Sequence, residues 1–156
     1  MKILLTGCKG QLGLELSYRL RESGKGINIV ETDIHNMDII NQGQVLNLVK
    51  EEKPDVIINC AAYTNVDGCE YNELDANRVN AVGAQNLSTA AYNIGAKIVQ
   101  ISTDYVFDGN INKPRKEYDI VNPINCYGKS KLLGEYLVRY TNPKHFIVRT
   151  AWLYGK

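Results

Sequence analysis

The sequence predicts an α/β fold, a doubly wound parallel sheet of the Rossmann type with three α/β/α layers. Three observations predict it. The chain opens on a short apolar run, residues 3–5, that leads straight into Gly7, Gly10 and Gly13. Units of an apolar strand followed by a helix then succeed one another over short links. The strands are continuous apolar runs, such as residues 55–60, of the kind that is buried on both faces of a parallel sheet.

Apolar periodicity and turn residues place the individual elements. The first helix carries Leu12, Leu16 and Leu20 about one turn apart. Right-handed crossovers are expected to bring the carboxyl ends of the first and fourth strands side by side, where such sheets bind ligands. The expected strands are 3–5, 27–30, 55–60, 96–102 and 144–150; the later helices are 41–52, 74–94 and one that opens at Tyr127; the loops include 37–40, 66–71 and 103–126.

The bulk composition restricts the class of protein. With 156 residues and 44% hydrophobic residues, residues 1–156 are expected to form one domain around one core. The formal charge of +1 is scattered, which argues against nucleic acid as a partner. No apolar run approaches the roughly 18 residues that span a bilayer, and no signal peptide precedes the first strand, so a cytoplasmic protein without membrane partners is expected. The cysteines form no C-x-x-C pair, so neither a metal site nor a disulfide framework is expected.

The glycine turn predicts a dinucleotide site. Glycines at this spacing let backbone N–H groups and the positive end of a helix dipole approach a diphosphate, although a turn without a ligand stays an alternative. Asp33 follows the second strand, where an acid usually binds the adenosine ribose; the alternative is a solvated loop carboxylate. No arginine follows it to hold a 2′-phosphate, which favours NADH over NADPH. Ala61 and Ala62, after the third strand, would let a cofactor lie against the sheet edge.

A second group of residues predicts proton-transfer chemistry. Ser102 and Thr103 end the fourth strand, and Tyr127 and Lys131 are four residues apart on one helical face. An ammonium close to a phenol lowers its pKa and makes the tyrosine a general acid or base. Alone, this spacing is typical of an interfacial tyrosine beside a solvated lysine. Its combination with the glycine turn predicts a nicotinamide-dependent enzyme.

At these residues the chain resembles the extended short-chain dehydrogenase/reductase superfamily, and within it the dTDP-4-dehydrorhamnose reductases. The resemblance implies NADH- or NADPH-dependent reduction of the 4-keto group of dTDP-4-dehydro-L-rhamnose, a step of nucleotide-sugar and cell-surface polysaccharide biosynthesis. The segments that carry it span nearly the whole chain: GCKGQLG (7–13), AAYTNVDGCE (61–70), STDYVFDG (102–109), NPINCYGKSKLLGE (122–135) and RTAWLYG (149–155).

The resemblance also implies a role for each matching residue. Tyr127 would be the proton donor, Lys131 its partner and a ribose ligand, and Thr103 the hydroxyl that tunes the site. Asp104 and Trp152, with Thr103, would contact the sugar nucleotide. The other cofactor contacts would be Gly7, Gly10, Gln11, Leu12 and Gly13 at the diphosphate, Asp33 at the adenosine ribose, Asp38 and Ile39 beside the adenine, and Ala62, Tyr63 and Thr64 at the nicotinamide.

The family's chains continue past residue 156 into a C-terminal domain that closes over the sugar nucleotide, so this sequence is expected to lack the substrate domain and to be weakly active or inactive alone. The fifth strand would then be an exposed apolar edge, which favours self-association as a homo-oligomer. Two alternatives stay open: a non-catalytic, dinucleotide-binding regulatory module, and a related nucleotide-sugar epimerase or dehydratase.

Overall fold

Five parallel strands form one sheet in the computed structural model, which describes residues 1–110 and 112–154. The strand order is β2-β1-β3-β4-β5, and neighbours in this order are hydrogen-bonded. The predicted doubly wound parallel sheet is therefore confirmed. The strands are β1 (Lys2–Thr6), β2 (Asn28–Thr32), β3 (Val56–Asn59), β4 (Lys97–Thr103) and β5 (His145–Thr150).

The chain reverses its winding direction at β1. From β1 it moves outward to β2 on one side and then crosses to β3 on the other, with Leu4 opposite both Val30 and Ile57. The expectation that the first and fourth strands end side by side is wrong, because β3 lies between β1 and β4. The crevice at the carboxyl ends consequently opens between β1 and β3, and β4 borders it one strand further along.

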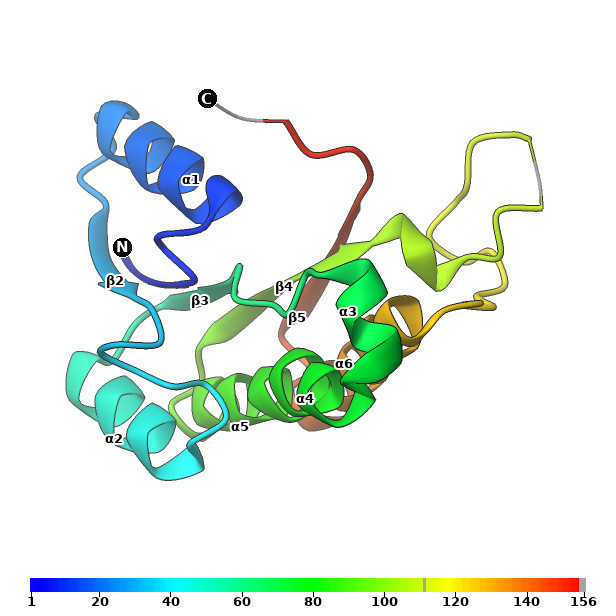
Figure 1. The fold of residues 1–156 in the computed structure, drawn as a ribbon. Helices are drawn as coiled ribbons and strands as arrows, with labels where there is room; N and C mark the ends of the chain where they lie inside the picture. Colours follow the sequence, from blue (N-terminus) through cyan, green and yellow to red (C-terminus); the bar gives the residue numbers. More distant parts are fainter. Residues whose placement is uncertain (111, 155–156) are drawn as a thin grey trace.

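Helices cover the two faces of the sheet unequally (Figure 1). The first helix, α1 (Gln11–Glu22), lies alone on one face, and the remaining helices pack on the other. The remaining α-helices are α2 (Gln42–Glu52), α3 (Val66–Tyr71), α4 (Glu73–Asn77), α5 (Ala84–Asn93) and α6 (Cys126–Thr141). The core lies between the sheet and this second layer, where Leu4, Ile57 and Ile98 of the strands meet Leu87 of α5 and Val138 of α6.

Two segments differ from the expectation. Residues 66–71, expected as a loop, form α3, because the Asn65 side chain accepts a hydrogen bond from the Gly68 N–H and caps the helix. The helix expected over residues 74–94 extends from Glu73 to Asn93 without a break in the helical backbone. Its middle part, Arg78–Gly83, is π-helical and separates α4 from α5. The segment after β4 begins with a short 3₁₀ turn, Asp104–Val106, before the long loop that leads to α6.

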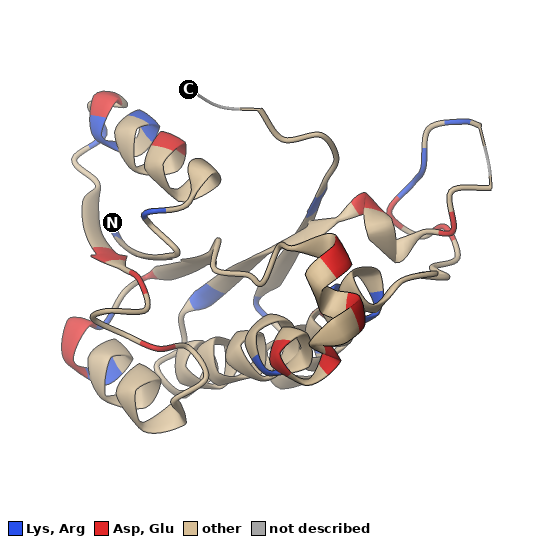
Figure 2. Cartoon of the chain, viewed as in Figure 1, with Lys and Arg blue, Asp and Glu red and all other residues tan. Residues whose placement is uncertain are grey.

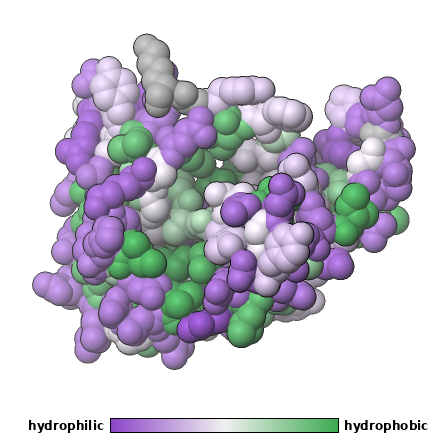
Figure 3. All heavy atoms as spheres, viewed as in Figure 1, coloured by the Kyte–Doolittle hydropathy of each residue, from purple (hydrophilic) through white to green (hydrophobic). Residues whose placement is uncertain are grey.

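The face of the sheet that carries α1 is partly open. The register places Ile58, Val99 and Phe146 in one row across β3, β4 and β5, and the Phe146 side chain is 55% exposed. Leu14 and Tyr18 on α1 are also exposed. Figure 3 shows apolar residues within a hollow of the surface, and Figure 2 shows acidic and basic residues interspersed over the ribbon. Among the described residues, no helix is both long and apolar enough to cross a membrane.

Candidate active site

The turn between β1 and α1 is built from glycines because the backbone passes other backbone at very short range. Gly7 has a positive φ of 66°, and a Cβ on it would lie 2.6 Å from the Ala61 nitrogen at the end of β3. A Cβ on Gly13 would run into the Gly7 carbonyl and approach the Cys8 Cα to 2.7 Å. The Gly10 N–H closes the turn by donating to the Gly7 carbonyl over 3.0 Å.

The amino terminus of α1 offers free backbone donors. The first N–H groups of a helix have no partner within the helix, and Gly10, the residue that precedes α1, provides no side-chain cap. Gln11, Leu12 and Gly13 form this first turn and line a cavity at the carboxyl ends of the strands. The positive end of the helix dipole therefore faces a space in which an anion can be bound.

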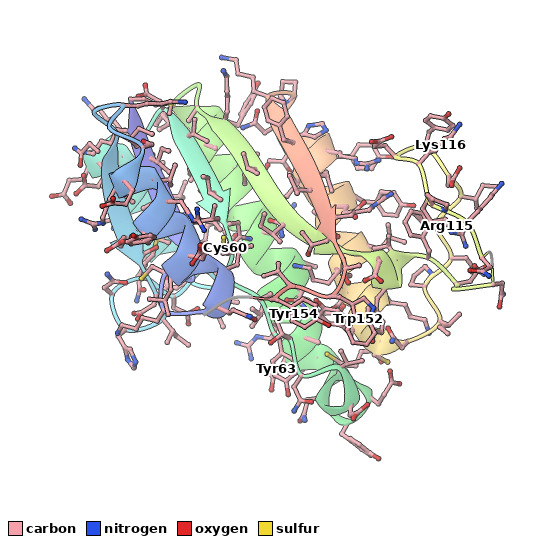
Figure 4. All side chains as sticks on the ribbon, turned by 90° about the horizontal axis from the view of Figure 1, so that it is seen from above. Cys60, Tyr63, Arg115, Lys116, Trp152 and Tyr154 are labelled. Atoms are coloured by element: carbon pink, nitrogen blue, oxygen red, sulfur yellow. The ribbon has the colours of Figure 1, made fainter. Side chains whose placement is uncertain are left out.

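The cavity has a volume of about 600 Å³ and gathers residues from all parts of the sequence. Every residue predicted to bind the cofactor lines it: Gly7, Gly10, Gln11, Leu12, Gly13, Asp33, Asp38, Ile39, Ala62, Tyr63, Thr64, Tyr127 and Lys131. Figure 4 shows the molecule from above, with Cys60 beside α1 and with Arg115 and Lys116 far out on the loop that follows β4. The glycine turn, the ends of β2 and β3 and the start of α6 thus form one site.

Asp33 is fixed just beyond β2, with one carboxylate oxygen turned toward Lys9. Its Oδ1 accepts a hydrogen bond from the His35 N–H over 2.9 Å. Its Oδ2 is buried and makes no well-directed hydrogen bond among the described residues, but Lys9 Nζ lies 2.6 Å away. The contact with Lys9, and then the His35 N–H, hold the pKa of Asp33 below its usual value. Glu31 lies within β2 and pairs with Arg21, so of the two acids at the end of β2 it is Asp33 that lines the cavity.

Residues 37–40 form the loop that was expected, and side chains from two helices hold it in place. The Asn86 amide of α5 donates to the carbonyl of Ile39 over 2.9 Å, and the Asp38 N–H donates to Gln44 Oε1 over 2.9 Å. Met37 and Ile39 are buried, and a Cβ on Gly83 would collide with Ile39. The loop therefore presents a fixed apolar wall to the cavity beside Asp38.

Lys131 is a buried ammonium at the floor of the cavity. Only 3% of the residue is exposed, and Nζ donates to the carbonyl oxygen of Ile101 in β4 over 2.7 Å. Burial lowers the pKa of Lys131 to about 8, although the nearby Glu135 carboxylate opposes the shift. Burial also raises the pKa of the neighbouring Cys60 thiol to about 11, so at neutral pH this cysteine carries no charge.

Tyr127 lines the same cavity one helical turn before Lys131, as the spacing predicts. The expected lowering of its pKa by Lys131 is not found in this structure. Burial raises the pKa of Tyr127, a hydrogen bond with Thr103 opposes the rise, and Lys131 is not among the groups that shift it. The ammonium points instead to the Ile101 carbonyl. The phenol is therefore protonated at neutral pH, and its ring packs edge-on against Tyr105 with centroids 5.6 Å apart.

The residues predicted to contact a sugar nucleotide lie outside the main cavity. Thr103 ends β4, interacts with Tyr127 and donates to Asp104 Oδ1 over 3.1 Å. Asp104 lines a neighbouring cavity beside Arg149. Trp152 is 82% exposed on the segment after β5, where Leu153 lines the main cavity instead. Gly155, the last residue of the 149–155 motif, lies outside the described residues.

Two buried polar residues that support the site were not predicted. Asn80, in the π-helical stretch, accepts from the Tyr63 N–H over 2.8 Å and donates to Ser130 Oγ over 2.9 Å, which ties the cavity wall to α6. Glu135 accepts hydrogen bonds from Ser102 and Arg149 and joins α6 to the ends of β4 and β5. In the sequence, Asn80 and Glu135 stand out as polar residues on the apolar faces of their helices. Their hydrogen-bond partners become apparent only from the fold.

Solved structures resemble this fold closely. A dTDP-4-dehydrorhamnose reductase from Clostridium acetobutylicum superimposes with a TM-score of 0.97 at 53% identity, over 100% of this chain and 55% of that chain. The dTDP-4-dehydrorhamnose reductase from Bacillus anthracis in complex with NADP superimposes with a TM-score of 0.96 at 44% identity, over 99% and 54% of the two chains.

Comparison with curated sequences leads to the same family as the solved structures. A curated dTDP-4-dehydrorhamnose reductase from Aggregatibacter actinomycetemcomitans is 42% identical over 155 residues, which is 99% of this chain and 52% of the relative. The chain thus spans about half the length of the curated relatives that it matches. The family model described as the RmlD substrate binding domain matches residues 1–156. The resemblance to dTDP-4-dehydrorhamnose reductases is confirmed, and the chain belongs to the RmlD substrate binding domain family.

Proposed function

We propose that the chain binds a nicotinamide dinucleotide and forms the cofactor-binding part of a reductase that acts on dTDP-4-dehydro-L-rhamnose. The observation that carries the proposal is that one cavity of about 600 Å³ gathers the glycine turn, Asp33, Tyr127 and Lys131. The Bacillus anthracis relative, solved in complex with NADP, supports the same assignment.

The residues of the cavity fit such a cofactor. The uncapped first turn of α1 would hold the diphosphate, and the absence of a Cβ on Gly10 leaves room for it to approach the backbone. The buried Asp33 Oδ2, which lacks a well-directed hydrogen bond, would accept one from a ribose hydroxyl. Residues 37–40 would pack against the adenine, and Tyr63 and Thr64 would line the nicotinamide end.

The reaction proposed is the reduction of a 4-keto group. A bound reduced nicotinamide supplies the hydride for the carbonyl carbon. Tyr127 donates its phenolic proton to the carbonyl oxygen, and its raised pKa keeps that proton in place at neutral pH. Thr103 orders the Tyr127 hydroxyl, and Lys131, held by the Ile101 carbonyl, would bind the ribose next to the nicotinamide.

Recognition of the sugar nucleotide would depend on further contacts. Asp104 and Trp152 lie outside the main cavity, and the chain spans about half the length of its relatives. Because contacts remote from the reacting atoms determine how well a substrate is held, we expect these 156 residues alone to bind the cofactor but to reduce the substrate slowly or not at all. The cytoplasmic location and a homo-oligomeric state stay predictions.

A binding titration tests the proposal. The purified chain is titrated into NADPH and, separately, into NADH, and binding is followed by the fluorescence of the reduced nicotinamide. We expect saturable binding that is lost when Gly10, where a side chain would meet the diphosphate rather than the chain's own backbone at close range, is replaced by valine. The Lys50→Gln variant, which changes an exposed residue of α2 that does not line the cavity, serves as the control. Absence of saturable binding of either cofactor to the folded chain would overturn the proposal.

A further inference from the structure

A row of three buried polar side chains crosses the sheet next to the main cavity. Thr6, Asn59 and Gln100 lie opposite one another in the register of β1, β3 and β4, and each is at most 2% exposed. Thr6 Oγ1 donates to Asn59 Oδ1 over 2.6 Å, and Asn59 Nδ2 donates to Gln100 Oε1 over 2.7 Å. Gln100 Nε2 then donates to the carbonyl oxygen of Ile101 over 3.0 Å. The row therefore ends on the oxygen that also accepts the ammonium of Lys131.

The direction of the row is fixed by backbone groups at its two ends. Asn59 Oδ1 also accepts from the backbone N–H of Ala61 over 3.1 Å. Because an N–H can only donate, the Asn59 atom at this point must be the oxygen, and the amide nitrogen must face Gln100. Gln100 in turn must present its oxygen to Asn59 and its nitrogen to the Ile101 carbonyl, which can only accept. All three side chains consequently donate toward Ile101.

The Ile101 carbonyl is free to accept because β3 ends before it can pair with this residue. The Lys97 N–H of β4 donates to Asp55 on the β3 side, and successive residues of a strand face opposite neighbours. Ile101, four residues further on, therefore faces the β3 side as well, where the strand has already ended at Asn59. A carbonyl without a partner in the sheet needs other donors, and here it takes them from two side chains.

Gln100 and Lys131 share this oxygen, which has two lone pairs to offer. Because Gln100 takes one of them, the ammonium makes a single hydrogen bond to Ile101, 2.7 Å long. An ammonium carries three N–H groups, and Lys131 Nζ makes no other hydrogen bond to the residues that the structure describes. Two N–H groups thus remain for a ligand in the cavity. If the Gln100 amide were turned round, its oxygen would compete for them.

We propose that Asn59 and Gln100 are positioning residues for Lys131: by delivering an N–H to the Ile101 carbonyl, they leave the ammonium one bond to the sheet and keep its other protons turned toward the cavity. Neither Asn59 nor Gln100 lines the cavity, so each acts on a ligand through Lys131. This role rests on the proposed function, in which those protons bind the ribose next to the nicotinamide. That ribose is common to NADH and NADPH, so both cofactors should be affected alike.

The test compares dissociation constants for NADPH and NADH, from nicotinamide fluorescence, between the wild-type chain and two variants of Gln100. In Gln100→Glu the side chain still accepts from Asn59 but turns an oxygen toward the ammonium and draws it from the cavity. Loss of one charge-assisted hydrogen bond should weaken both cofactors about ten-fold. Gln100→Met offers no competing oxygen and should weaken them less. If the row served packing only, Gln100→Met would be the more damaging, because it leaves the buried Asn59 amide unpaired.

Two further variants separate positioning from packing. Asn59→Asp reverses the row without altering Gln100: a carboxylate can only accept, so the Gln100 amide must turn its oxygen to Ile101, and both affinities should fall as in Gln100→Glu. Asn142→Asp is the matched control. Asn142 is 1% exposed, and its amide donates to the Ala96 carbonyl over 3.1 Å at the other end of β4, away from the cavity. Asn142→Asp should keep both affinities.

The pH dependence of binding gives a readout that a loss of packing would not move. Burial lowers the pKa of Lys131 to about 8, and the ionisable groups that act on it are Glu135 on α6 and Cys60 after β3. Wild-type affinity for NADPH should therefore fall as the pH rises through this value and Lys131 loses its charge. The added carboxylate of Gln100→Glu favours the ammonium, so in this variant the fall should occur at a higher pH.

The outcomes separate this role from the proposed function. Wild-type affinities in folded Gln100→Glu and Asn59→Asp, or an equal loss in Asn142→Asp, would overturn the positioning role and leave the cofactor site intact. A fall in affinity at the same pH in Gln100→Glu and in the wild type would also overturn it. Where Gln100→Glu does not fold, Asn59→Asp decides. A wild-type chain that bound neither cofactor would overturn the proposed function, and this role with it.

Discussion

The ammonium of Lys131 donates a 2.7 Å hydrogen bond to the carbonyl oxygen of Ile101, at the point where β4 reaches the floor of the cavity. The same carbonyl accepts a second hydrogen bond from the Gln100 side chain. The backbone of β4 thus fixes a buried charge close to Tyr127. Burying this charge lowers the free energy of unfolding of the chain. Such a loss of stability is expected for a residue that is kept for its function, because functional sites often lower the stability of a fold.

Replacing Lys131 by methionine is therefore expected to stabilise the fold at neutral pH. The pKa of Lys131 is about 8 in the folded chain and 10.5 as its ordinary value, which corresponds to a cost of about 3 kcal/mol for burying the charge. The cost is fully present below pH 8 and is relieved as pH rises toward 10.5, because the folded chain then releases its proton first. Urea unfolding should show a gain for Lys131→Met at pH 7 that shrinks by pH 10.

The gain depends on the Ile101 carbonyl keeping the hydrogen bond from Gln100. Lys50→Met, at an exposed site of α2, is the control and should show no pH-dependent gain. Two results would contradict this account: a Lys131→Met variant less stable than the wild type at pH 7, or a stability difference that is the same at pH 7 and pH 10. Either would show that the buried charge of Lys131 does not lower the stability of the fold.

Removing the charge of Glu135 is expected to destabilise the chain strongly. Glu135 is fully buried and accepts from Arg149 Nε over 2.8 Å, from Arg149 Nη2 over 2.7 Å and from Ser102 Oγ over 2.7 Å. In Glu135→Gln the largely buried guanidinium loses its counter-ion, which typically costs about 3–5 kcal/mol. Chemical denaturation measures this loss.

A double variant distinguishes the cost of the unpaired charge from damage to packing. Glu135→Gln with Arg149→Met removes both charges and should recover most of the stability lost in the single variant. If the double variant is less stable than Glu135→Gln by the full effect of Arg149→Met alone, the two side chains act independently and the ion pair is not the reason for the loss.

Alanine at Gly10 and at Gly13 should separate cofactor binding from folding. Gly10 has a negative φ, and a Cβ on it would lie 3.3 Å from the Gly7 carbonyl, so Gly10→Ala should cost about 1 kcal/mol of stability or less. The added methyl group would occupy the approach to the diphosphate, which should weaken NADPH binding at least about ten-fold.

Gly13→Ala should instead lower the unfolding midpoint, because its Cβ would meet the backbone of Gly7 and Cys8. Thermal unfolding and nicotinamide fluorescence, measured on both variants, check the contrast. Wild-type affinity for NADPH in a folded Gly10→Ala chain would contradict the assignment of the turn to the diphosphate.

The sequence predicted the sheet and the cavity walls because these depend on local patterns. Apolar runs define the strands, and glycines at 7, 10 and 13 define a turn whose ligand geometry follows from the backbone. The order of the strands could not be predicted in this way. Whether β3 or β4 pairs with β1 depends on which side each crossover takes, and periodicity along the chain carries no such information.

The supporting contacts were missed because they join residues that are distant in the sequence. Asn80 bonds Ser130 across 50 positions, and Lys131 donates to Ile101 across 30. The four-residue spacing correctly placed Tyr127 and Lys131 on one face of α6, but it could not show where the ammonium points. For α3, the cap by Asn65 outweighed the low helix propensity of a six-residue segment with a central glycine.

The measurement that tests the account most directly is the reduction of dTDP-4-dehydro-L-rhamnose by the full-length gene product and its Tyr127→Phe variant. NADPH consumption follows turnover, and fluorescence titration follows cofactor binding. We expect Tyr127→Phe to bind NADPH as the wild type does and to lose turnover by a factor of about 100 or more, because its general acid is gone. Turnover of Tyr127→Phe at the wild-type rate would contradict the role of Tyr127. A wild-type protein that binds NADPH without reducing the sugar would contradict the reductase and support a regulatory module.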